Sequence, residues 1–256
     1  MSFVEELNNA NAFIIGASQG IGLGFVQKLL QDDRFAKIYA TYRQPESAAD
    51  LLALEGEHPD KLTCLSMDIT DESQIIDVVQ KISAVVNKLH LVVNCVGLLH
   101  EGALQPEKSL KRINSEYLMH YFQVNSIGAI LLAKHLLSLF RHHERSVFAS
   151  ISAKVGSIGD NQLGGWYGYR ASKAALNMLM RTAAIEYKRT SPKTVIVMLH
   201  PGTTDTRLSR PFQANVPPEK LFSVERTVNQ LFAVIEQLQD GDSGQFFSWD
   251  GSRLPW

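Results

Sequence analysis

The chain has 256 residues, of which 45% are hydrophobic and 20% charged, and its formal net charge is −1. This length and composition allow one large α/β unit or two small domains, with a sizeable buried core. The near-neutral charge provides no general field for attracting nucleic acid or an anionic membrane, so we expect neither as a partner.

Three features of the sequence bear on the compartment. The N-terminal segment MSFVEELNNA lacks the positive region and apolar core of a secretory signal. Cys64 and Cys95 lie in apolar, strand-like runs without ligand-like neighbours, which favours reduced thiols over a disulfide or a zinc site. The apolar stretch 128–140 is interrupted by Lys134 and His135 and is too short to span a bilayer. We therefore expect a soluble, cytoplasmic protein without a bound metal.

Short apolar runs alternate with segments of helical periodicity, and no repeat or low-complexity linker marks a domain boundary. Seven apolar runs are strand candidates: 11–16, 36–43, 61–69, 89–97, 145–153, 193–202 and 244–251. Helix-period segments occupy 21–32, 45–56, 70–86 and about 106–140, and a further helix begins within 164–179.

Local signals place several helix ends. Pro45 suits the first turn of a helix, and Gly56 suits its end. Thr70 is a candidate N-cap, with Asp71 and Glu72 suited to the positive end of the helix dipole.

Strands that are apolar on both faces and alternate with helices predict a mostly parallel sheet that is covered on both sides. We predict a single Rossmann-like, doubly wound α/β domain over residues 1–256, with seven strands. In such sheets ligands bind outside the carboxyl ends of the strands, so function is expected where these strands end.

The first strand runs into the turn GASQGIG, with glycines at Gly16, Gly20 and Gly22. Glycines in this place allow a tight turn and let backbone N–H groups approach a pyrophosphate at a helix N-terminus. The spacing differs from the common Gly-x-Gly-x-x-Gly fingerprint, and any tight strand-to-helix turn can use a glycine. Its position at the first strand of the series favours phosphate binding.

The second strand ends in ATYRQ. A free ribose 2′-hydroxyl usually meets an acid at this strand end, whereas a 2′-phosphate favours arginine. No acid occurs between Ala36 and Pro45, and Arg43 lies where a phosphate partner is useful. The pattern favours NADP(H) over NAD(H); the alternative is a solvated surface arginine.

The third and fourth strands also end in polar residues. Asp68 can accept a hydrogen bond from an adenine amino group, or it can merely cap the following helix. In NCVG, Asn94 and Gly97 interrupt an apolar run, which weakens a strand unless backbone there approaches a ligand or another segment.

A later helix contains Tyr169 and Lys173, four residues apart and therefore on one face. An ammonium beside a phenol favours the phenolate and moves the phenol's pKa from about 10 toward the working range of an acid–base catalyst. The alternative is a surface helix with a lysine that reaches into solvent.

Taken together, GASQGIG, NCVG, YRASK and HPGTTDT resemble the motifs of the short-chain dehydrogenase/reductase family, in the family's order and over nearly the whole chain. The stretch GSIGDNQLGGWYGYRASKAALNM and the ending WDGSRLPW look most like the branch of C-factor and Sniffer-type carbonyl reductases.

The resemblance implies a hydride transfer from a nicotinamide, with Tyr169 as proton donor and Lys173 also bonding the nicotinamide ribose. Asn125 matches the family asparagine whose backbone carbonyl holds a water of the proton relay. The implied cofactor site comprises Gly16, Ser18, Gln19, Gly20, Ile21, Gly22, Arg43, Asp68, Ile69, Asn94, Val96, Gly97, Tyr169, Lys173, Pro201, Gly202, Thr203 and Thr206.

One position departs from the family pattern. The family commonly has a serine three residues before a glycine at the end of the fifth strand, and counting back from Gly156 that position is Ala153. Ser150 and Ser157 are further candidates, but we expect Ser152 to stabilise the developing alkoxide. The departure leaves open a weakened contact, or a fold kept for binding alone.

The segments 99–110 and 207–222 are loop-like and are expected to border the substrate. Trp166 and Tyr167 either line an apolar pocket or are ordinary packing residues. The histidines show no metal-ligand spacing, and we assign them no chemistry.

The sequence thus predicts an NADP(H)-dependent reductase or dehydrogenase acting on a small carbonyl or alcohol. The alternative is a nucleotide-binding signalling or regulatory protein of the C-factor type with little turnover. Family members usually form dimers or tetramers, and the apolar helices at 127–140 and 174–187 predict such a homo-oligomer.

Overall fold

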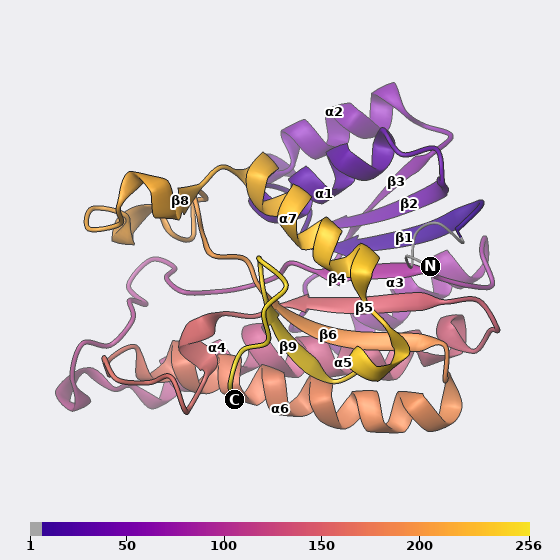
Figure 1. Ribbon diagram of the computed structural model, residues 1–256. Coiled ribbons are helices and arrows are strands. Elements are labelled where there is room, and N and C mark those ends of the chain that lie inside the picture. Colours follow the sequence, from indigo (N-terminus) through magenta and orange to yellow (C-terminus); the bar gives the residue numbers. More distant parts are fainter. Residues whose placement is uncertain (1–6) are drawn as a thin grey trace.

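A computed structural model describes residues 7–256; the first six residues of the N-terminal segment lie outside it. One parallel sheet of seven strands, in the order β3-β2-β1-β4-β5-β6-β9, runs through the middle of the molecule (Figure 1). Its strands are β1 (Ala10–Ile15), β2 (Phe35–Tyr42), β3 (Leu62–Ser66), β4 (Leu91–Asn94), β5 (Ser146–Ile151), β6 (Thr194–His200) and β9 (Gln245–Ser248). The predicted doubly wound sheet is confirmed.

Helices cover both faces of this sheet, as Figure 1 shows. One layer holds α1 (Gly20–Leu30), α2 (Ala49–Glu57) and α7 (Val224–Gln237). The other layer holds α3 (Glu72–Ser83), α4 (Ser115–Phe122), α5 (Gly128–Leu136) and α6 (Tyr167–Thr190). Each layer buries its own apolar cluster against the sheet, because β1 and β5 are buried on both faces.

Several helix ends differ from the sequence prediction. Pro45 begins a separate turn, Pro45–Ser47, and Gly56 lies inside α2 instead of ending it. Asp71, not Thr70, caps α3, because its side chain accepts hydrogen bonds from the backbone N–H groups of Ser73 and Gln74. The region predicted as helical from residue 106 contains only a short helical turn, Leu110–Arg112, before α4, where Asn114 provides the cap.

The helical run Ser115–Phe140, which includes α4 and α5, is long and apolar enough to cross a membrane by length and composition alone. Within this fold it packs against α3 and α6, and 44% of its most apolar window is buried. Lys134 and His135, near the end of α5, both bond to Glu72 of α3. In this fold the run is therefore part of the helical layer that covers one face of the sheet.

A short pair of parallel strands, β7 (Thr203–Thr204) and β8 (Leu221–Phe222), lies outside the main sheet. The segment between them contains only short helical turns, at Arg210–Phe212 and Pro218–Lys220. The prolines there prevent a continuous helix, as the sequence predicts. The pair holds this segment over the carboxyl ends of the main strands (Figure 1).

Candidate active site

A cavity of about 790 Å³ follows the carboxyl ends of the central strands. Most of the predicted cofactor residues line it: Gly16, Ser18, Gln19, Gly20, Ile21, Gly22, Arg43, Asp68, Ile69, Val96, Gly97, Tyr169, Lys173, Pro201, Gly202, Thr203 and Thr206. Asn94 does not line the cavity, but its side chain accepts a hydrogen bond from the N–H of Val96 and so shapes the wall.

The glycine-rich turn after β1, residues 16–22, forms the phosphate cradle, and its backbone is packed too closely for a side chain at Gly22. A Cβ atom on Gly22 would lie 2.2 Å from the carbonyl oxygen of Gly16. Gln19, the N-cap of α1, makes no side-chain capping bond, and the first turn contains no acid. The N–H groups at this helix start are therefore available to an anion, and the donor set fits the pyrophosphate of a dinucleotide.

The segment after β6 closes over the same turn. Gly202 adopts φ +74, and a Cβ atom on Gly20 would lie 3.2 Å from the Thr206 methyl group. Thr203 pairs with Leu221 in the β7–β8 pair and lines the cavity beside Pro201. This arrangement covers the phosphate cradle from the side opposite β2.

Tyr169 and Lys173 meet inside the cavity as the helical spacing predicts. The Lys173 ammonium lies 5.9 Å from the centre of the Tyr169 ring and donates to the carbonyl oxygen of Ile151 at 2.9 Å. Within residues 7–256, the Tyr169 hydroxyl has no hydrogen-bond partner, although its residue lines the cavity. A ligand can therefore bond to this hydroxyl.

Burial sets the protonation of this pair. Desolvation lowers the pKa of Lys173 to about 8 and raises the pKa of Tyr169 above its ordinary value. The expected lowering of the tyrosine's pKa by the lysine is not found, because desolvation of the buried phenol raises this pKa. The Tyr169 phenol is therefore protonated at neutral pH.

The two glycines before α6 serve the placement of Tyr169. Gly164, Gly165 and Trp166 all have left-handed φ values, of 65, 67 and 52. This turn lets the buried carboxylate of Glu107 accept a hydrogen bond from the backbone N–H of Gly168 at 3.1 Å. The hydrogen bond satisfies one of the N–H groups that a helix start leaves unpaired, and it fixes the first turn of α6, which contains Tyr169.

Asn125 lies behind the cavity wall in a π-helical turn, Gln123–Ile127, between α4 and α5. Its side-chain amide accepts from the N–H of Leu98 at 2.7 Å and donates to Ser172, one residue before Lys173. A π-helical turn disturbs the usual backbone bonding of a helix and is frequent at functional sites. The asparagine thus joins the loop after β4 to α6; its role in a water relay stays a prediction.

The sequence profile of the short chain dehydrogenase family matches residues 10–217. The protein belongs to the short-chain dehydrogenase family. Its fold and the order of its strand-end motifs, as described above, agree with this assignment.

Two curated relatives resemble this short-chain dehydrogenase. The benzil reductase ((S)-benzoin forming) of Saccharomyces cerevisiae is 30% identical over 268 residues, covering 94% of this chain and 96% of its own. The C-signal of Myxococcus xanthus is 31% identical over 135 residues, covering 53% of this chain and 76% of its own.

Two solved structures superpose closely. The NADPH-bound carbonyl reductase from chicken fatty liver has a TM-score of 0.87 at 27% identity, covering 98% of this chain and 96% of its own. The carbonyl reductase Sniffer of D. melanogaster has a TM-score of 0.85 at 25% identity, covering 97% and 100%. The predicted similarity to the C-factor and Sniffer-type branch is confirmed.

The predicted serine, Ser152, lines the cavity together with Ala153, Tyr169 and Lys173. Ser152 is buried beneath α6 and donates its hydroxyl to the Asn177 side chain at 2.7 Å. Ser150, on the same face, is also buried, and Ser157 accepts from the N–H of Asp160. Ala153 instead packs in the cluster that contains Tyr169. The hydroxyl of Ser152 is thus engaged by Asn177 at the cavity wall, and its role as the alkoxide donor stays a prediction.

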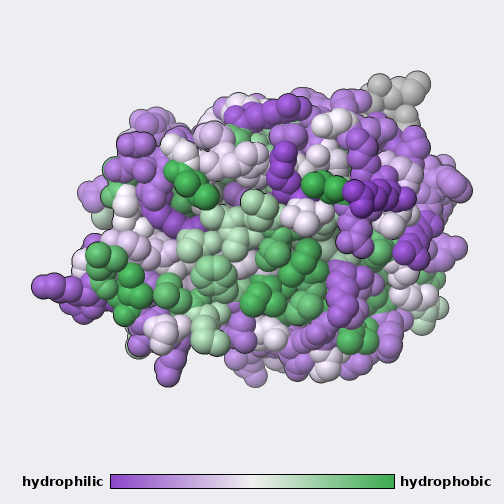
Figure 2. All heavy atoms as spheres, turned by 90° about the horizontal axis from the view of Figure 1, so that it is seen from below, coloured by the Kyte–Doolittle hydropathy of each residue, from purple (hydrophilic) through white to green (hydrophobic). Residues whose placement is uncertain are grey.

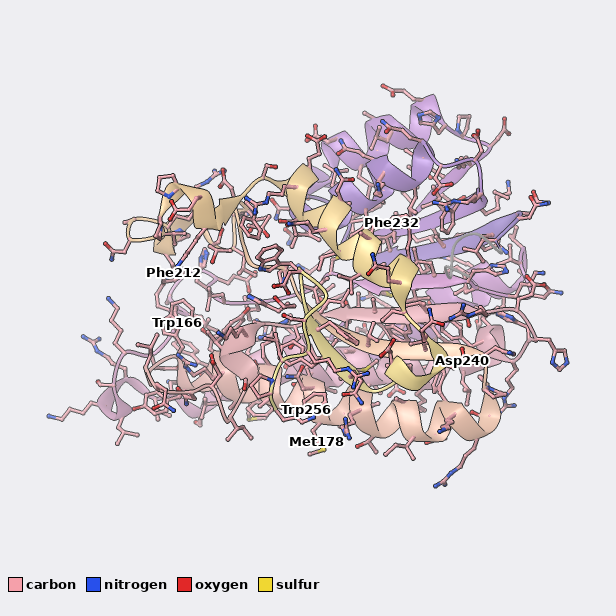
Figure 3. The ribbon with its side chains drawn as sticks, viewed as in Figure 1. Trp166, Met178, Phe212, Phe232, Asp240 and Trp256 are labelled. Carbon is pink, nitrogen blue, oxygen red and sulfur yellow. The ribbon has the colours of Figure 1, made fainter. Side chains whose placement is uncertain are left out.

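Aromatic side chains line the end of the cavity beside Tyr169. Trp166 makes edge contacts with Tyr169 and Phe212, at ring distances of 6.2 and 5.0 Å. Figure 3 shows Trp166, at the start of α6, facing Phe212 of the segment between β7 and β8. Tyr167 does not line the cavity. Of the two aromatic candidates, Trp166 is therefore the pocket residue, and the two predicted loops do border this end.

Other cavity residues were not singled out from the sequence. Glu101 pairs with Arg43 at 2.8 Å and with His120 at 3.4 Å across the mouth of the cavity. His200 is half-buried at the end of β6, where desolvation lowers its pKa to about 4. The glutamate and the first histidine carry no motif. Only the folded chain brings Glu101 to Arg43 and His120 to Glu101, since the three residues lie on separate elements.

Proposed function

We propose that this short-chain dehydrogenase is an NADP(H)-dependent oxidoreductase that interconverts a carbonyl and an alcohol, with an apolar, aromatic-sized substrate. The observation that carries the proposal is the unpartnered Tyr169 hydroxyl beside buried Lys173, between a phosphate cradle and an aromatic pocket. The NADPH-bound state of the similar chicken carbonyl reductase supports the choice of cofactor.

The residues have the following proposed roles. The glycine turn and Arg43 hold the phosphates of the dinucleotide, and Lys173 bonds its nicotinamide ribose. The bound nicotinamide supplies or accepts the hydride. Tyr169 donates a proton to the carbonyl oxygen during reduction, for which a raised pKa keeps the phenol protonated. Trp166 and Phe212 exclude water and contact the apolar part of the substrate.

The test pairs binding with turnover. NADPH and NADH are titrated into the protein, and loss of NADPH absorbance is then followed with a carbonyl panel that includes benzil, because benzil reductase is a relative. We expect tighter binding of NADPH, and turnover that falls by at least about 10²-fold in Tyr169→Phe. Tyr167→Phe is the control, since Tyr167 does not line the cavity. Unchanged turnover in Tyr169→Phe would exclude the proposed proton donor.

A second function is favoured by Ala153, which places a methyl group where the family has its alkoxide donor. It is a nucleotide-binding regulatory protein with little turnover, and the similarity to the C-signal supports it. Tight NADPH binding without turnover on any carbonyl would favour this function over the first.

We also propose that the protein is cytoplasmic, with two free thiols, and assembles as a homodimer or homotetramer. Figure 2 views the molecule from below, on the side where Figure 1 shows α6, and apolar side chains gather on this face. Ile127, Met178 and Ile185 are exposed large apolar residues of the two helices predicted to form an interface.

A further inference from the structure

Arg43, the residue proposed to hold a 2′-phosphate, already has an anionic partner. Its Nη2 atom donates to Oε1 of Glu101 at 2.8 Å, from the end of β2 to the loop after β4. The side chains are 49% and 47% exposed, and both residues line the cavity. The ion pair therefore spans the cavity mouth at the end where the adenosine of a dinucleotide is expected.

The carboxylate of Glu101 is held from a second side. Its Oε2 atom lies 3.4 Å from Nε2 of His120 on α4. The loop that carries it is folded tightly, with a bridge between Glu101 and Leu104 and a left-handed Gly102. The hydrogen bond from Arg43 holds the pKa of Glu101 below its ordinary value, so the carboxylate is charged at neutral pH.

We infer that the Glu101 carboxylate binds Arg43 where the cofactor's 2′-phosphate would bind. Glu101 thereby determines how strongly the protein discriminates NADP(H) from NAD(H). This inference rests on the proposed function. Carboxylate and phosphate are the two anions that a guanidinium binds through the same N–H groups. A 2′-phosphate carries more charge than one carboxylate and displaces it, whereas the 2′-hydroxyl of NAD(H) does not.

The structure provides a place for the displaced carboxylate. When Glu101 leaves Arg43, it keeps His120 as a partner, and its half-exposed carboxylate stays accessible to solvent. Asp68 also lies near enough to act on Arg43 electrostatically, and it remains in both states. Glu101 therefore weakens NADP(H) binding selectively, and its removal widens the preference for NADP(H).

Glu101→Gln tests this inference, with Glu116→Gln as the matched control. Glu116 is an exposed acid at the start of α4, and it forms no ion pair with residues in the part of the chain described. Dissociation constants are measured by calorimetry for NADPH, NADH, 2′,5′-ADP and 5′-ADP. Exposed ion pairs contribute up to about fivefold to an equilibrium constant. We expect Glu101→Gln to tighten NADPH and 2′,5′-ADP by about three- to fivefold.

Binding of NADH and 5′-ADP should change by less than about twofold, and the gain for NADPH should shrink at high salt, where exposed charges are screened. Equal tightening of NADH, or weaker binding of NADH, would overturn the inference, because Glu101 would then act on both cofactors or bond the ribose. Arg43→Ala separates the two proposals. If it weakens NADPH while Glu101→Gln has no effect, the inference alone fails; if it leaves NADPH unchanged, the NADP(H) preference fails as well.

Discussion

At the scale of single residues, burying the ammonium of Lys173 lowers the free energy of unfolding by an amount that depends on pH. Burial lowers its pKa to about 8 from an ordinary value of 10.5. Between these values the unfolded chain binds one more proton than the folded chain, so the lysine's contribution makes the free energy of unfolding rise with pH. Below pH 8 the folded protein carries a charged, desolvated ammonium at full cost.

Lys173→Met therefore should stabilise the protein at pH 7 and lose turnover. The gap in unfolding free energy between the variant and the original protein should close by roughly 1 to 2 kcal/mol between pH 8 and pH 9.5. Urea unfolding across this range measures it. Lys188→Met, at an exposed position of the same helix, should give an offset that does not change with pH. A constant gap for Lys173→Met would mean that the buried lysine keeps its ordinary pKa.

Ala153 and Ser152 form a second residue-scale contrast. Ala153→Ser restores a hydroxyl at the position where the family commonly has one, and we expect kcat to rise by about tenfold or more, since one such donor is worth about 10² to 10³. Ser152→Ala removes only the bond to Asn177, so it should cost about 1 kcal/mol of stability and change kcat less than about threefold. Steady-state kinetics and urea unfolding of both variants check this.

The opposite result is equally informative. If Ser152→Ala abolishes turnover while the protein stays folded and binds NADPH, Ser152 is the donor that the sequence predicts, and its hydroxyl must leave Asn177 during catalysis.

At the scale of elements, two helical glycines differ in what surrounds them. A Cβ atom on Gly56, inside α2, would meet nothing within 4 Å. On Gly128, at the start of α5, it would lie 2.5 Å from the Ile69 side chain and 2.8 Å from the Ile69 carbonyl oxygen. Gly128 thus allows α5 to approach the loop that also carries Asp68.

Gly56→Ala should raise the free energy of unfolding by about 0.5 to 1 kcal/mol, because alanine loses less backbone entropy in a helix. Gly128→Ala should lower it by about 1 to 3 kcal/mol through overpacking. Chemical denaturation of the pair measures both signs. Stabilisation by Gly128→Ala would show that α5 moves away from Ile69 at little cost.

The same elements show what the sequence can predict. Period and apolarity identify all seven strands and the layers around them, because both faces of each central strand must be buried. Helix ends are less certain. Thr70 and Asp71 are both good caps, and only the backbone conformation at Asp71 decides between them. Gly56 is a helix-ending residue by type, yet α2 continues through it.

The candidate site divides in the same way. Residues fixed by a local motif, such as the glycine turn and the pair Tyr169–Lys173, reach the cavity as predicted. Properties that depend on distant packing do not follow from the sequence. The desolvation of Tyr169, the bond of Ser152 to Asn177 and the pairing of Arg43 with Glu101 all require residues far apart in the chain to be placed together.

At the scale of the whole molecule, the exposed apolar residues of α6 predict self-association. Met178 and Ile185 of α6 are 65% and 55% exposed. Figure 2, which views the molecule from the side where Figure 1 shows α6, shows apolar side chains gathered on this face. A contiguous apolar face of this kind is unusual on a monomer, and burying it against a second copy contributes about 25 cal/mol per Å². We expect light scattering to give a mass of two or four times 28.5 kDa.

Ile185→Lys should shift the protein toward the monomer, because a buried interface would then contain an unpaired charge in each copy. Val85→Lys is the control: Val85 is 67% exposed, but it follows α3 and lies outside α6. Its mass should match that of the original protein. If both variants and the original protein sediment as monomers of 28.5 kDa, α6 is not an interface between copies, and its apolar residues remain in contact with solvent.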